Sequence, residues 1–400
     1  MKFKLKEVLT VKGYIRGPFG SALKRGDMKD SGIPVYEQQN AIYNNRNFRY
    51  FIDEEKLKGL KRFIVQENDL IISCSGTVGS VSIIRKNDPI GIISQALLTL
   101  RPNTKLIIPE FLYYFFKSNK GYKSIISRSS GSVQVNIGKR DIIENIDIYV
   151  PTLEVQKQTV LILSNIDKKI EINNKINNNL QYLSHLLFKQ WFVDFEFENE
   201  EGLSYKSSGG QMVDSDLGMI PKGWKVASLG DIVCLNYGKA LTSKDRVAGD
   251  VKVYSSAGHT GFHNRALVES DGIIVGRKGN IGTVYYARDR FYCIDTSYYI
   301  TQKDCKFDLV WVFELLKQLK LKELNEDSVV PGLNRNTVYF QKIVVPTNEV
   351  VGSLSNILSS IIKSMFHYSD ENETLSNLRD TLLTKLMNGE IDLSNLEIDF

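Results

Sequence analysis

Cysteine and histidine, two residue types that often act in catalysis or bind metals, are few in this chain. The four cysteines form no Cys-x-x-Cys pair, and the four histidines lack the spacing of metal ligands. The sequence contains neither a Walker A motif for ATP nor an Asn/Asp-Pro-Pro-aromatic motif of the kind that surrounds a flipped base. The run Asp53-Glu54-Glu55 beside Lys56 faintly suggests a nuclease but is more typical of a charged turn. We therefore expect no catalytic residue, no metal site and no cofactor bound by this chain.

Basic residues, in contrast, are concentrated in two stretches. Residues 1–150 hold 24 Lys and Arg against 14 Asp and Glu, and residues 221–345 hold 18 against 13. The stretches 151–220 and 346–400 are acidic, with 6 against 10 and 3 against 9. The alternation favours contact of the two basic stretches with a polyanion, although chance variation along a solvated surface would also produce it.

Length and composition indicate a multidomain protein that acts inside the cell. A chain of 400 residues usually has more than one hydrophobic core, and 42% hydrophobic with 24% charged residues is ordinary for a globular protein. No window holds the roughly 18 apolar residues of a membrane span, and the N-terminus lacks the apolar segment of a signal peptide. The scattered cysteines are typical of the reducing cytoplasm, where we expect the protein to be located, without a membrane partner.

The second half of the chain repeats the first in a diverged form. Five short matches occur in the same order in both halves, which is difficult to obtain by chance. The matched segments are Leu5–Val8 with Leu229–Ile232, Ile33–Tyr36 with Val251–Tyr254, Gly76–Gly79 with Gly279–Gly282, Gln134–Asn136 with Asn334–Asn336, and Ile146–Thr152 with Gln341–Thr347. The chain is therefore predicted to contain a duplicated domain.

Each copy changes character at a Pro-Thr pair. Before this pair, short apolar runs separated by Gly-rich turns predict a compact, strand-rich α/β domain with one short helix. The expected strands are 69–73, 80–85, 91–101, 272–275, 283–287 and 298–301, and the expected short helices are 109–118 and 309–321. After the pair, the hydrophobic period becomes helical, which predicts a long helix in each copy, roughly 37 residues or about 55 Å in length.

The apolar positions of these long helices form a stripe that needs a partner. In the second helix, the stripe steps by alternating 4 and 3 residues through Leu354, Leu358, Ile361, Met365, Tyr368, Asn372, Leu375, Arg379, Leu382 and Leu386. In the first, it includes Ile166, Ile170, Ile176, Leu180, Leu183 and Leu187. We expect the two helices to pack as an antiparallel coiled coil, with the two domains related by a pseudo-twofold axis. The alternative is that each helix only covers its own domain.

The predicted fold class is thus α+β, with two strand-rich α/β domains joined by two long antiparallel helices. The predicted segments are a first domain (1–150), a first long helix (151–196), a linker (197–220), a second domain (221–345), and a second long helix with a C-terminal tail (346–400).

Several motifs resemble those of specificity subunits of type I restriction–modification enzymes. They are Phe19-Gly-Ser-Ala22, Gly32-Ile-Pro-Val-Tyr-Glu-Gln-Gln39, Ile71-Ile-Ser-Cys-Ser-Gly-Thr-Val-Gly79, Trp191-Phe-Val-Asp-Phe-Glu196, Ile220-Pro-Lys-Gly-Trp224, Gly276-Arg-Lys-Gly279, Val330-Pro-Gly-Leu-Asn-Arg335 and Leu378-Arg-Asp-Thr-Leu-Leu383. The resemblance spans the whole chain and is specific as a set.

This resemblance implies a non-catalytic subunit that reads a bipartite, asymmetric DNA site with two target-recognition domains. Its long helices would act as a spacer and would dock methyltransferase subunits, expected to be two, and through them restriction (helicase-nuclease) subunits. S-adenosylmethionine, ATP and Mg would be used by those partner chains. The alternatives are a free-standing DNA-binding scaffold or regulator, and a single-chain enzyme with diverged motifs. The DNA sequence, the methylated base and the existence of a nuclease partner do not follow from the sequence.

The chemistry of bases and phosphates indicates candidate DNA contacts. Arg and Lys suit guanine, Asn and Gln suit adenine, and further Lys and Arg neutralise phosphates. The candidates in the first domain are Gln38, Gln39, Asn40 and Ser75 for bases, beside Glu37, and Lys24, Arg25 and Lys139 for phosphates. Those in the second domain are Ser255, Ser256, His259, Arg277 and Lys278.

Overall fold

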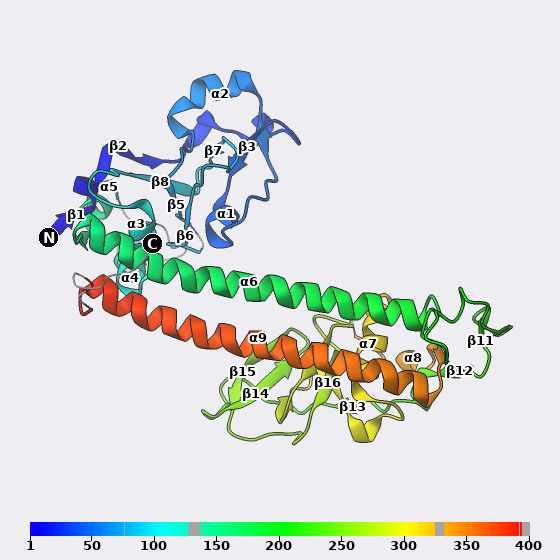
Figure 1. The fold of residues 1–400 in the computed structure, drawn as a ribbon. Coiled ribbons are helices and arrows are strands. Elements are labelled where there is room, and N and C mark those ends of the chain that lie inside the picture. The colour runs from blue at the N-terminus through cyan, green and yellow to red at the C-terminus, as the bar shows by residue number, and fades with distance from the viewer. Residues whose placement is uncertain (76, 127–136, 138, 325–331, 392, 394–400) are drawn as a thin grey trace. The chain divides into compact units, whose positions relative to one another are not determined.

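The computed structural model describes residues 1–75, 77–126, 137, 139–324, 332–391 and 393, and it divides into two compact units (Figure 1). Unit 1 consists of Met1–Ile172 and Glu371–Phe400, and unit 2 consists of Asn173–Asp370. Both divisions fall inside long helices, whereas the predicted segments ended where those helices begin. Each unit therefore contains part of both helices.

Unit 1 is built from short, buried strands and small helices. Its strands are β1 (Lys2–Lys4), β2 (Leu9–Arg16), β3 (Ile33–Tyr36), β4 (Phe51–Ile52), β5 (Leu70–Ser73), β6 (Val81–Ile83), β7 (Ile92–Ile93), β8 (Leu97–Pro102) and β9 (Asp147–Tyr149). Its short helices are α1 (Gln38–Ile42), α2 (Glu54–Leu60), α3 (Pro109–Lys117), α4 (Asn119–Ile126) and α5 (Arg140–Glu144). The helix α3 begins with a proline, whose fixed φ suits the first helical position.

Unit 2 has the same kinds of elements in a similar order. Its strands are β10 (Met212–Val213), β11 (Ile220–Pro221), β12 (Lys225–Ser228), β13 (Asn236–Tyr237), β14 (Val251–Ser255), β15 (Gly258–His263), β16 (Gly272–Gly276), β17 (Val284–Ala287), β18 (Phe291–Cys293), β19 (Ser297–Thr301) and β20 (Lys342–Val345). Its short helices are α7 (Leu309–Gln318), which Asp308 caps through the backbone N–H of Val310, and α8 (Arg335–Tyr339).

The strand order is the same in both units. Within the described residues, the sheet β2-β8-β5-β6 corresponds to β13-β19-β16-β17, β4-β3-β7 corresponds to β15-β14-β18, and the pair β1-β9 corresponds to β12-β20. Even the parallel pairs correspond, β3 with β7 and β14 with β18. The Gly-rich turns close alike, because Gly79 N–H donates to the Ser73 carbonyl and Gly282 N–H to the Gly276 carbonyl, both at 2.9 Å. The predicted duplication is confirmed.

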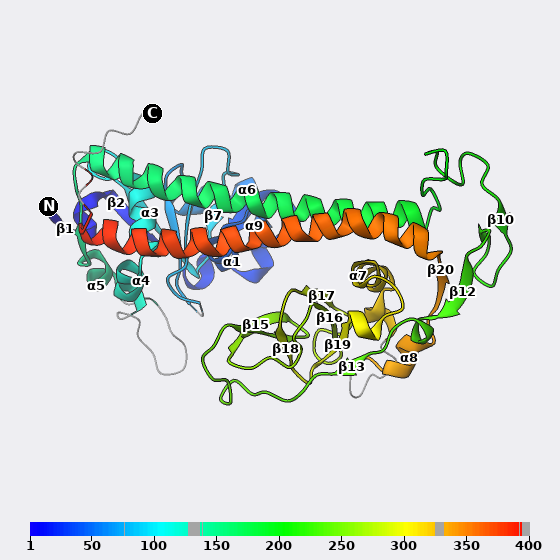
Figure 2. The ribbon, with the colours of Figure 1, turned by 60° about the horizontal axis from the view of Figure 1, so that its bottom comes forward.

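The two long helices are α6 (Leu153–Phe192), with 40 residues, and α9 (Asn348–Asn388), with 41. They lie side by side and antiparallel within each unit (Figures 1 and 2), as predicted. In unit 1 the first part of α6 meets the last part of α9, where Arg379 lies 3.0 Å from Asp167. In unit 2 the last part of α6 meets the first part of α9. Neither these nor the other described helices are long and apolar enough to cross a membrane.

The same helices also cover the domain cores, but the alternative that each helix only covers its own domain is wrong, because the helices also pack against each other. In unit 1, Leu163 of α6 and Leu383 of α9 belong to one core with Phe111 and Phe115 of α3. Asp167 ties the three helices together, because it accepts the Tyr114 hydroxyl at 2.9 Å in addition to its ion pair.

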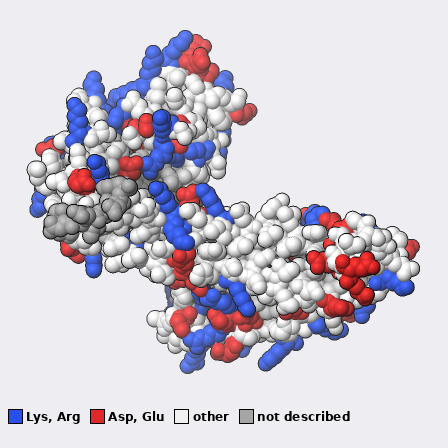
Figure 3. All heavy atoms as spheres, in the orientation of Figure 1, with Lys and Arg blue, Asp and Glu red and all other residues white. Residues whose placement is uncertain are grey.

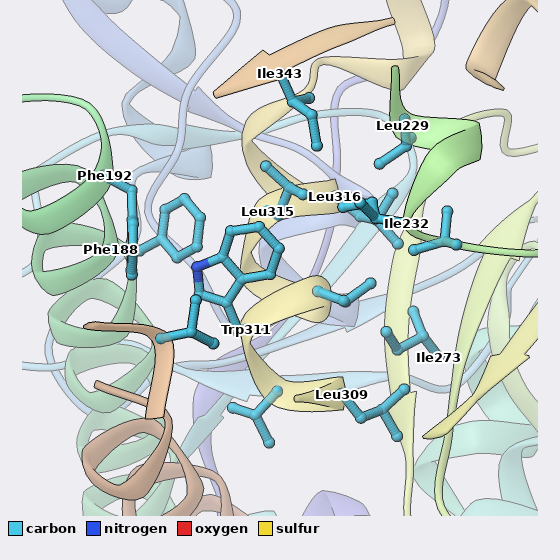
Figure 4. Close-up of a cluster of buried hydrophobic side chains, with 14 of the residues drawn as sticks. Phe188, Phe192, Leu229, Ile232, Ile273, Leu309, Trp311, Leu315, Leu316 and Ile343 are labelled. Atoms are coloured by element: carbon cyan, nitrogen blue, oxygen red, sulfur yellow. The ribbon is translucent and has the colours of Figure 1, made fainter. Parts of the chain in front are cut away.

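In unit 2, the core forms where α6, α7 and α9 meet the four-stranded sheet. The close-up in Figure 4 shows the indole of Trp311, on α7, between the Phe188 and Phe192 rings of α6 and the Leu315 side chain. The Ser184 hydroxyl of α6 donates to the buried carboxylate of Glu314 at 2.7 Å, which adds a polar tie between α6 and α7.

The predicted stripe of α9 is correct, since every one of its members is buried or half-buried. The stripe of α6 is partly wrong, because Leu183 is 45% exposed while the polar residues Asn173 and Ser184 are buried. The buried face of α6 also includes Asn177, which donates to Ser369 of α9 at 3.2 Å. Small polar residues therefore occupy part of the buried face of this helix, in line with the asparagines that interrupt its apolar stripe in the sequence.

The predicted linker 197–220 is a folded segment of unit 2. The Phe197 ring stacks on Tyr205 at 4.6 Å and on Trp224 at 5.0 Å between centroids. Two strands, β10 and β11, pair within or beside this segment. A single strand over 91–101 is also incorrect, because the chain turns at Ser94 and continues as β7 and β8 in two different sheets.

Candidate nucleic-acid interface

Two of the predicted base-contacting residues of unit 1 meet beside the end of β5. Gln38 is the first residue of α1, and Ser75 follows β5. The Gln38 amide donates to the Ser75 hydroxyl at 2.6 Å, and both side chains are partly exposed. The bond fixes the orientation of an amide that can present a donor and an acceptor to adenine.

Their neighbours have structural roles. Asn40 is fully buried, accepts from the Glu37 backbone N–H at 2.7 Å and donates to the Asn47 carbonyl at 3.0 Å. The prediction of Asn40 as a DNA contact is corrected, because its amide holds the loop after α1. Gln39 donates to the same Asn47 carbonyl at 3.2 Å. Glu37 binds Arg49 through two bonds of 2.8 and 2.9 Å.

A basic cavity of about 330 Å³ opens beside β2. Four of its lining residues are cations and none is acidic, and they are accompanied by two aromatic rings. The lining consists of Tyr14, Arg16, Phe19, Arg62, Ile137, Lys139 and Arg140. Lys139 was predicted from the sequence, but the other three cations were missed. The adjacent pair Lys139-Arg140 was a usable signal for Arg140, whereas Arg16 and Arg62 come from distant segments.

The other two predicted phosphate contacts of unit 1 lie elsewhere. Lys24 and Arg25 are exposed on the loop that precedes β3 and do not line the basic cavity. The loop is held by Asp27, which accepts the Lys24 backbone N–H at 2.8 Å and pairs with Lys56 at 2.8 Å. The hydrogen bond and charge of Lys56 lower the pKa of Asp27, so this carboxylate stays ionised.

In unit 2 the most distinctive candidate is Arg277, at the end of β16. Its guanidinium carbon lies 5.3 Å from the Tyr237 ring centroid and 5.9 Å from that of Tyr298. Arg335, which was not among the predicted DNA contacts, lies 5.2 Å from the same Tyr237 ring. The Nε atom of Arg277 is buried without a hydrogen-bond partner in the described structure. Such a cation is oriented by aromatic rings and still has donors to satisfy.

Two serines of unit 2 support a turn. Ser255 and Ser256 are 7% and 6% exposed. The Ser255 hydroxyl accepts the Ala257 backbone N–H at 3.1 Å, and the Ser256 carbonyl accepts the Thr283 hydroxyl at 2.7 Å. The prediction of both serines as DNA contacts is corrected on this ground, because burial and these bonds commit them to the turn.

His259 and Lys278, in contrast, are exposed. The His259 ring lies 4.9 Å from that of Phe262 on β15, and Lys278 follows Arg277 on the Gly-rich turn. The backbone N–H groups of Arg277 and Lys278 both donate to the Thr296 carbonyl, at 2.9 and 3.0 Å. The turn thus places Arg277 and Lys278 in a fixed backbone conformation.

The two fully buried thiols, Cys74 and Cys293, are not activated. Burial raises the pKa of the Cys74 and Cys293 thiols to about 12, so both remain protonated at neutral pH and are poor nucleophiles. Within the described ranges, no group of three or more His, Cys, Asp and Glu side chains is placed to hold a metal ion.

Charge is distributed unevenly over the surface. Figure 3 shows Lys and Arg spread over the visible face of unit 1, and a cluster of Asp and Glu over the β10–β11 end of unit 2. The acidic residues around that end include Asp194, Glu196, Glu198, Glu200, Glu201, Asp214 and Asp216. A polyanion would be repelled from this end of unit 2 and attracted to the basic loops.

Comparisons with known proteins identify one family. The family model described as "Type I restriction modification DNA specificity domain" matches residues 1–182 and 221–373. The chain is 23% identical to the "Type I restriction enzyme HindI specificity subunit" of Haemophilus influenzae, over 89% of this chain and 94% of the relative. It is 25% identical to the "Type I restriction enzyme MjaIX specificity subunit" of Methanocaldococcus jannaschii, over 88% and 85%.

A solved structure has a similar fold. The "Type-I restriction-modification system S subunit from M. genitalium" superimposes with a TM-score of 0.60 at 19% identity, over 97% of this chain and 96% of that one.

Proposed function

Because the chain belongs to the type I restriction–modification DNA specificity family, we propose that it reads a bipartite, asymmetric DNA site, one half-site with each unit. The observation that carries this proposal is the duplication: two units share one strand order but differ in the side chains beside equivalent turns. At the end of the central strand, for example, Cys74 of unit 1 occupies the position of Arg277 in unit 2, since their N–H groups bond Ala96 and Thr296 alike, at 2.9 Å. Equal scaffolds with different side chains suit two different half-sites.

The proposed base contacts are the predicted residues whose side chains are exposed or partly exposed at the ends of strands and helices. In unit 1 this is Gln38, oriented by Ser75. In unit 2 these are Arg277 and Lys278 after β16, together with His259 on β15 of the neighbouring sheet. An arginine suits the two acceptors of guanine, and an amide suits adenine. Lys24 and Arg25 remain proposed phosphate contacts because they are exposed.

The chain itself is proposed to be non-catalytic and to act in the cytoplasm with methyltransferase subunits, two of them by analogy with its two copies. In this proposal the methyltransferases use S-adenosylmethionine, and restriction subunits that join through them use ATP and Mg. Exposed apolar side chains on α6 support a docking role for this helix: Tyr182, Leu183 and Leu186 are 63%, 45% and 41% exposed.

Deleting the gene should remove one bipartite methylation motif from the host genome, and Arg277→Ala should relax the bases accepted in one half of that motif. The physical reason is that only one unit loses a donor pair to a base edge. Sequencing the methylated bases of wild-type, deletion and variant strains measures both effects. An unchanged methylome after deletion would contradict the proposed function and favour a free-standing regulator. Equal weakening at every sequence would instead make Arg277 a phosphate contact.

The double substitution Leu183→Asp and Leu186→Asp should abolish co-purification of methyltransferase subunits without unfolding the chain. Both side chains are exposed, so the carboxylates are solvated in the free chain but would be buried unpaired in the complex. Gln181→Asp, at an exposed position of the same helix, is the matched control. Pull-down through the full-length chain, with circular dichroism to verify folding, measures the outcome. Retention of both methyltransferases by the double variant would place docking elsewhere.

A further inference from the structure

Both units place an arginine at an equivalent point beside the four-stranded sheet. The N–H of Ile137 donates to the Cys74 carbonyl at 3.0 Å, and that of Leu333 donates to the Arg277 carbonyl at 2.8 Å. These bonds join the end of the central strand, β5 or β16, to the segment before α5 or α8. Arg140 and Arg335 are the first residues of those two short helices. The scaffold therefore delivers the two arginines to corresponding places.

Each of these arginines lies on a tyrosine of the corresponding edge strand, β2 or β13. The two tyrosines are two residues apart in register, because Tyr14 pairs with Leu100 and Tyr237 pairs with Tyr298, the counterpart of Leu98. The Arg140 guanidinium carbon is 5.2 Å from the Tyr14 ring centroid on β2, and that of Arg335 is 5.2 Å from the Tyr237 ring centroid on β13. A guanidinium over an aromatic ring is held in place by the ring, while its N–H groups point outward in the plane of the guanidinium and can still donate hydrogen bonds. Arg140 also forms an ion pair with Glu144, with 2.8 Å between Nη2 and Oε1, and the N–H groups that do not bond Glu144 remain available for a ligand. The shared geometry is that of a positioned cation, in both units.

The surroundings of both arginines contain donors without acceptors. Arg16, in the basic cavity beside Arg140, has a buried Nη1 atom with no partner in the described structure, and Arg277, beside Arg335, has a buried Nε atom in the same condition. The Arg16 side chain lies close to Cys74, the counterpart of Arg277, so each unit has an arginine side chain near this end of the central strand. Buried donors without partners are costly, which favours a ligand rich in acceptor oxygens.

We propose that Arg140 and Arg335 are the phosphate contacts of the two units. Each binds a phosphodiester of the DNA backbone, whatever the base sequence. This rests on the proposed function, in which the two units read different base sequences. A base-reading side chain must differ between two units that read different sequences, but phosphates have the same chemistry at every nucleotide. The arginine–tyrosine arrangement occurs in both units, so it fits the phosphate. Arg277 has a cysteine as its counterpart and therefore stays with the base readers.

The test uses the complex purified through the full-length chain and two duplexes, one with the methylated motif of the host and one without it. Arg140→Ala and Arg335→Ala should each weaken binding to both duplexes by the same factor, roughly 10-fold or more, as expected for one lost charge-assisted contact. Each should also reduce the slope of log affinity against log salt by about 0.9. Arg140→Lys and Arg335→Lys should retain most of the salt slope, since the charge stays.

The matched controls are Arg85→Ala in unit 1 and Arg290→Ala in unit 2. Their side chains are 53% and 50% exposed and ion-paired, against 56% for Arg140, and neither lies on the arginine–tyrosine arrangement. The controls should leave affinity unchanged. Loss of preference for particular bases in either alanine variant, or unchanged affinity in both, would overturn the phosphate assignment. Equal wild-type binding to both duplexes would overturn the proposed function instead, while the absolute affinities would still test Arg140 and Arg335.

Discussion

Trp311→Ala is expected to lower the free energy of unfolding of unit 2 by about 3–5 kcal/mol. Trp311 is fully buried on α7, and its ring centroid lies 5.7 Å from that of Phe192 and 6.1 Å from that of Phe188. Both phenylalanines belong to α6, so the cavity left by the indole would open where the last part of this helix packs against α7. The substitution should therefore loosen the attachment of α6 as well as the core.

The effect can be assigned to unit 2 because of where the tryptophans lie. All three, Trp191, Trp224 and Trp311, belong to the core of that unit. Urea unfolding followed by fluorescence, with two tryptophans left in the variant, reports unit 2. Labelling of the buried Cys74 thiol, detected by mass spectrometry, reports unit 1 in the same samples. The urea concentration at the unfolding midpoint should fall strongly when it is measured by fluorescence, and little when it is measured by labelling of Cys74.

Trp311→Phe is the control that separates volume from polarity. The indole Nε1 is buried with no hydrogen-bond partner in the described structure, so phenylalanine removes an unsatisfied donor together with some volume. Removing the unsatisfied donor stabilises the unit, whereas losing volume destabilises it. The free energy of unfolding should therefore fall much less for Trp311→Phe than for Trp311→Ala. An equal loss for both substitutions would contradict the packing explanation and indicate a hydrogen bond to the indole.

Much of the fold followed from the sequence because it depends on periodic burial. The stripe of α9 was predicted residue by residue, since apolar positions such as Leu354 and Leu358 repeat at the helical period and are fully buried. The stripe of α6 was not, because polar residues, Asn173 and Ser184, occupy buried positions on this helix, and Ser184 donates a hydrogen bond to Glu314 there. A hydrophobic pattern cannot reveal a buried position that is occupied by a polar residue. Leu183 was therefore placed on the buried face of α6, although it is exposed.

The folded segment before β12 escaped prediction for a related reason. Its acidic and small residues are typical of a linker, but a few aromatic side chains determine its structure. Phe197, 5% exposed, packs between Tyr205 and Trp224. Isolated aromatic residues in an acidic segment form no period, so nothing in the local pattern distinguished this core contact from an exposed ring.

The candidate site was predicted least completely, because the same residue types contact bases and hold turns. Asn40 and Ser256 have the chemistry of base contacts, yet both are buried, and each supports a loop. Arg16 and Arg62 join Lys139 in one cavity only through the tertiary fold. The repeat was the best guide, since it directed attention to the ends of β5 and β16, where Gln38 with Ser75 and Arg277 with Arg335 are found.

Lengthening both long helices equally should widen the gap between the two half-sites without changing the half-sites. We propose that α6 and α9 set this gap, since both helices continue from one unit into the other. The change is an insertion of four helix-forming residues between Ile172 and Asn173, with four more between Asp370 and Glu371. Because the helices are antiparallel, this matched insertion preserves the contacts inside each unit, and the new residues pair with one another.

Four residues add about 6 Å of helix, which corresponds to nearly two base pairs at about 3.4 Å each. They also add about 40° beyond a full turn, close to the twist of one base pair. Length and rotation together predict a gap that is larger by one or two base pairs, read directly from the methylated motif of the variant strain. Insertion into α6 alone is the control, because the extra residues would bulge from the helix pair and leave the gap unchanged. Retained methylation with an unchanged gap in the matched variant would show that the helices do not determine the spacing.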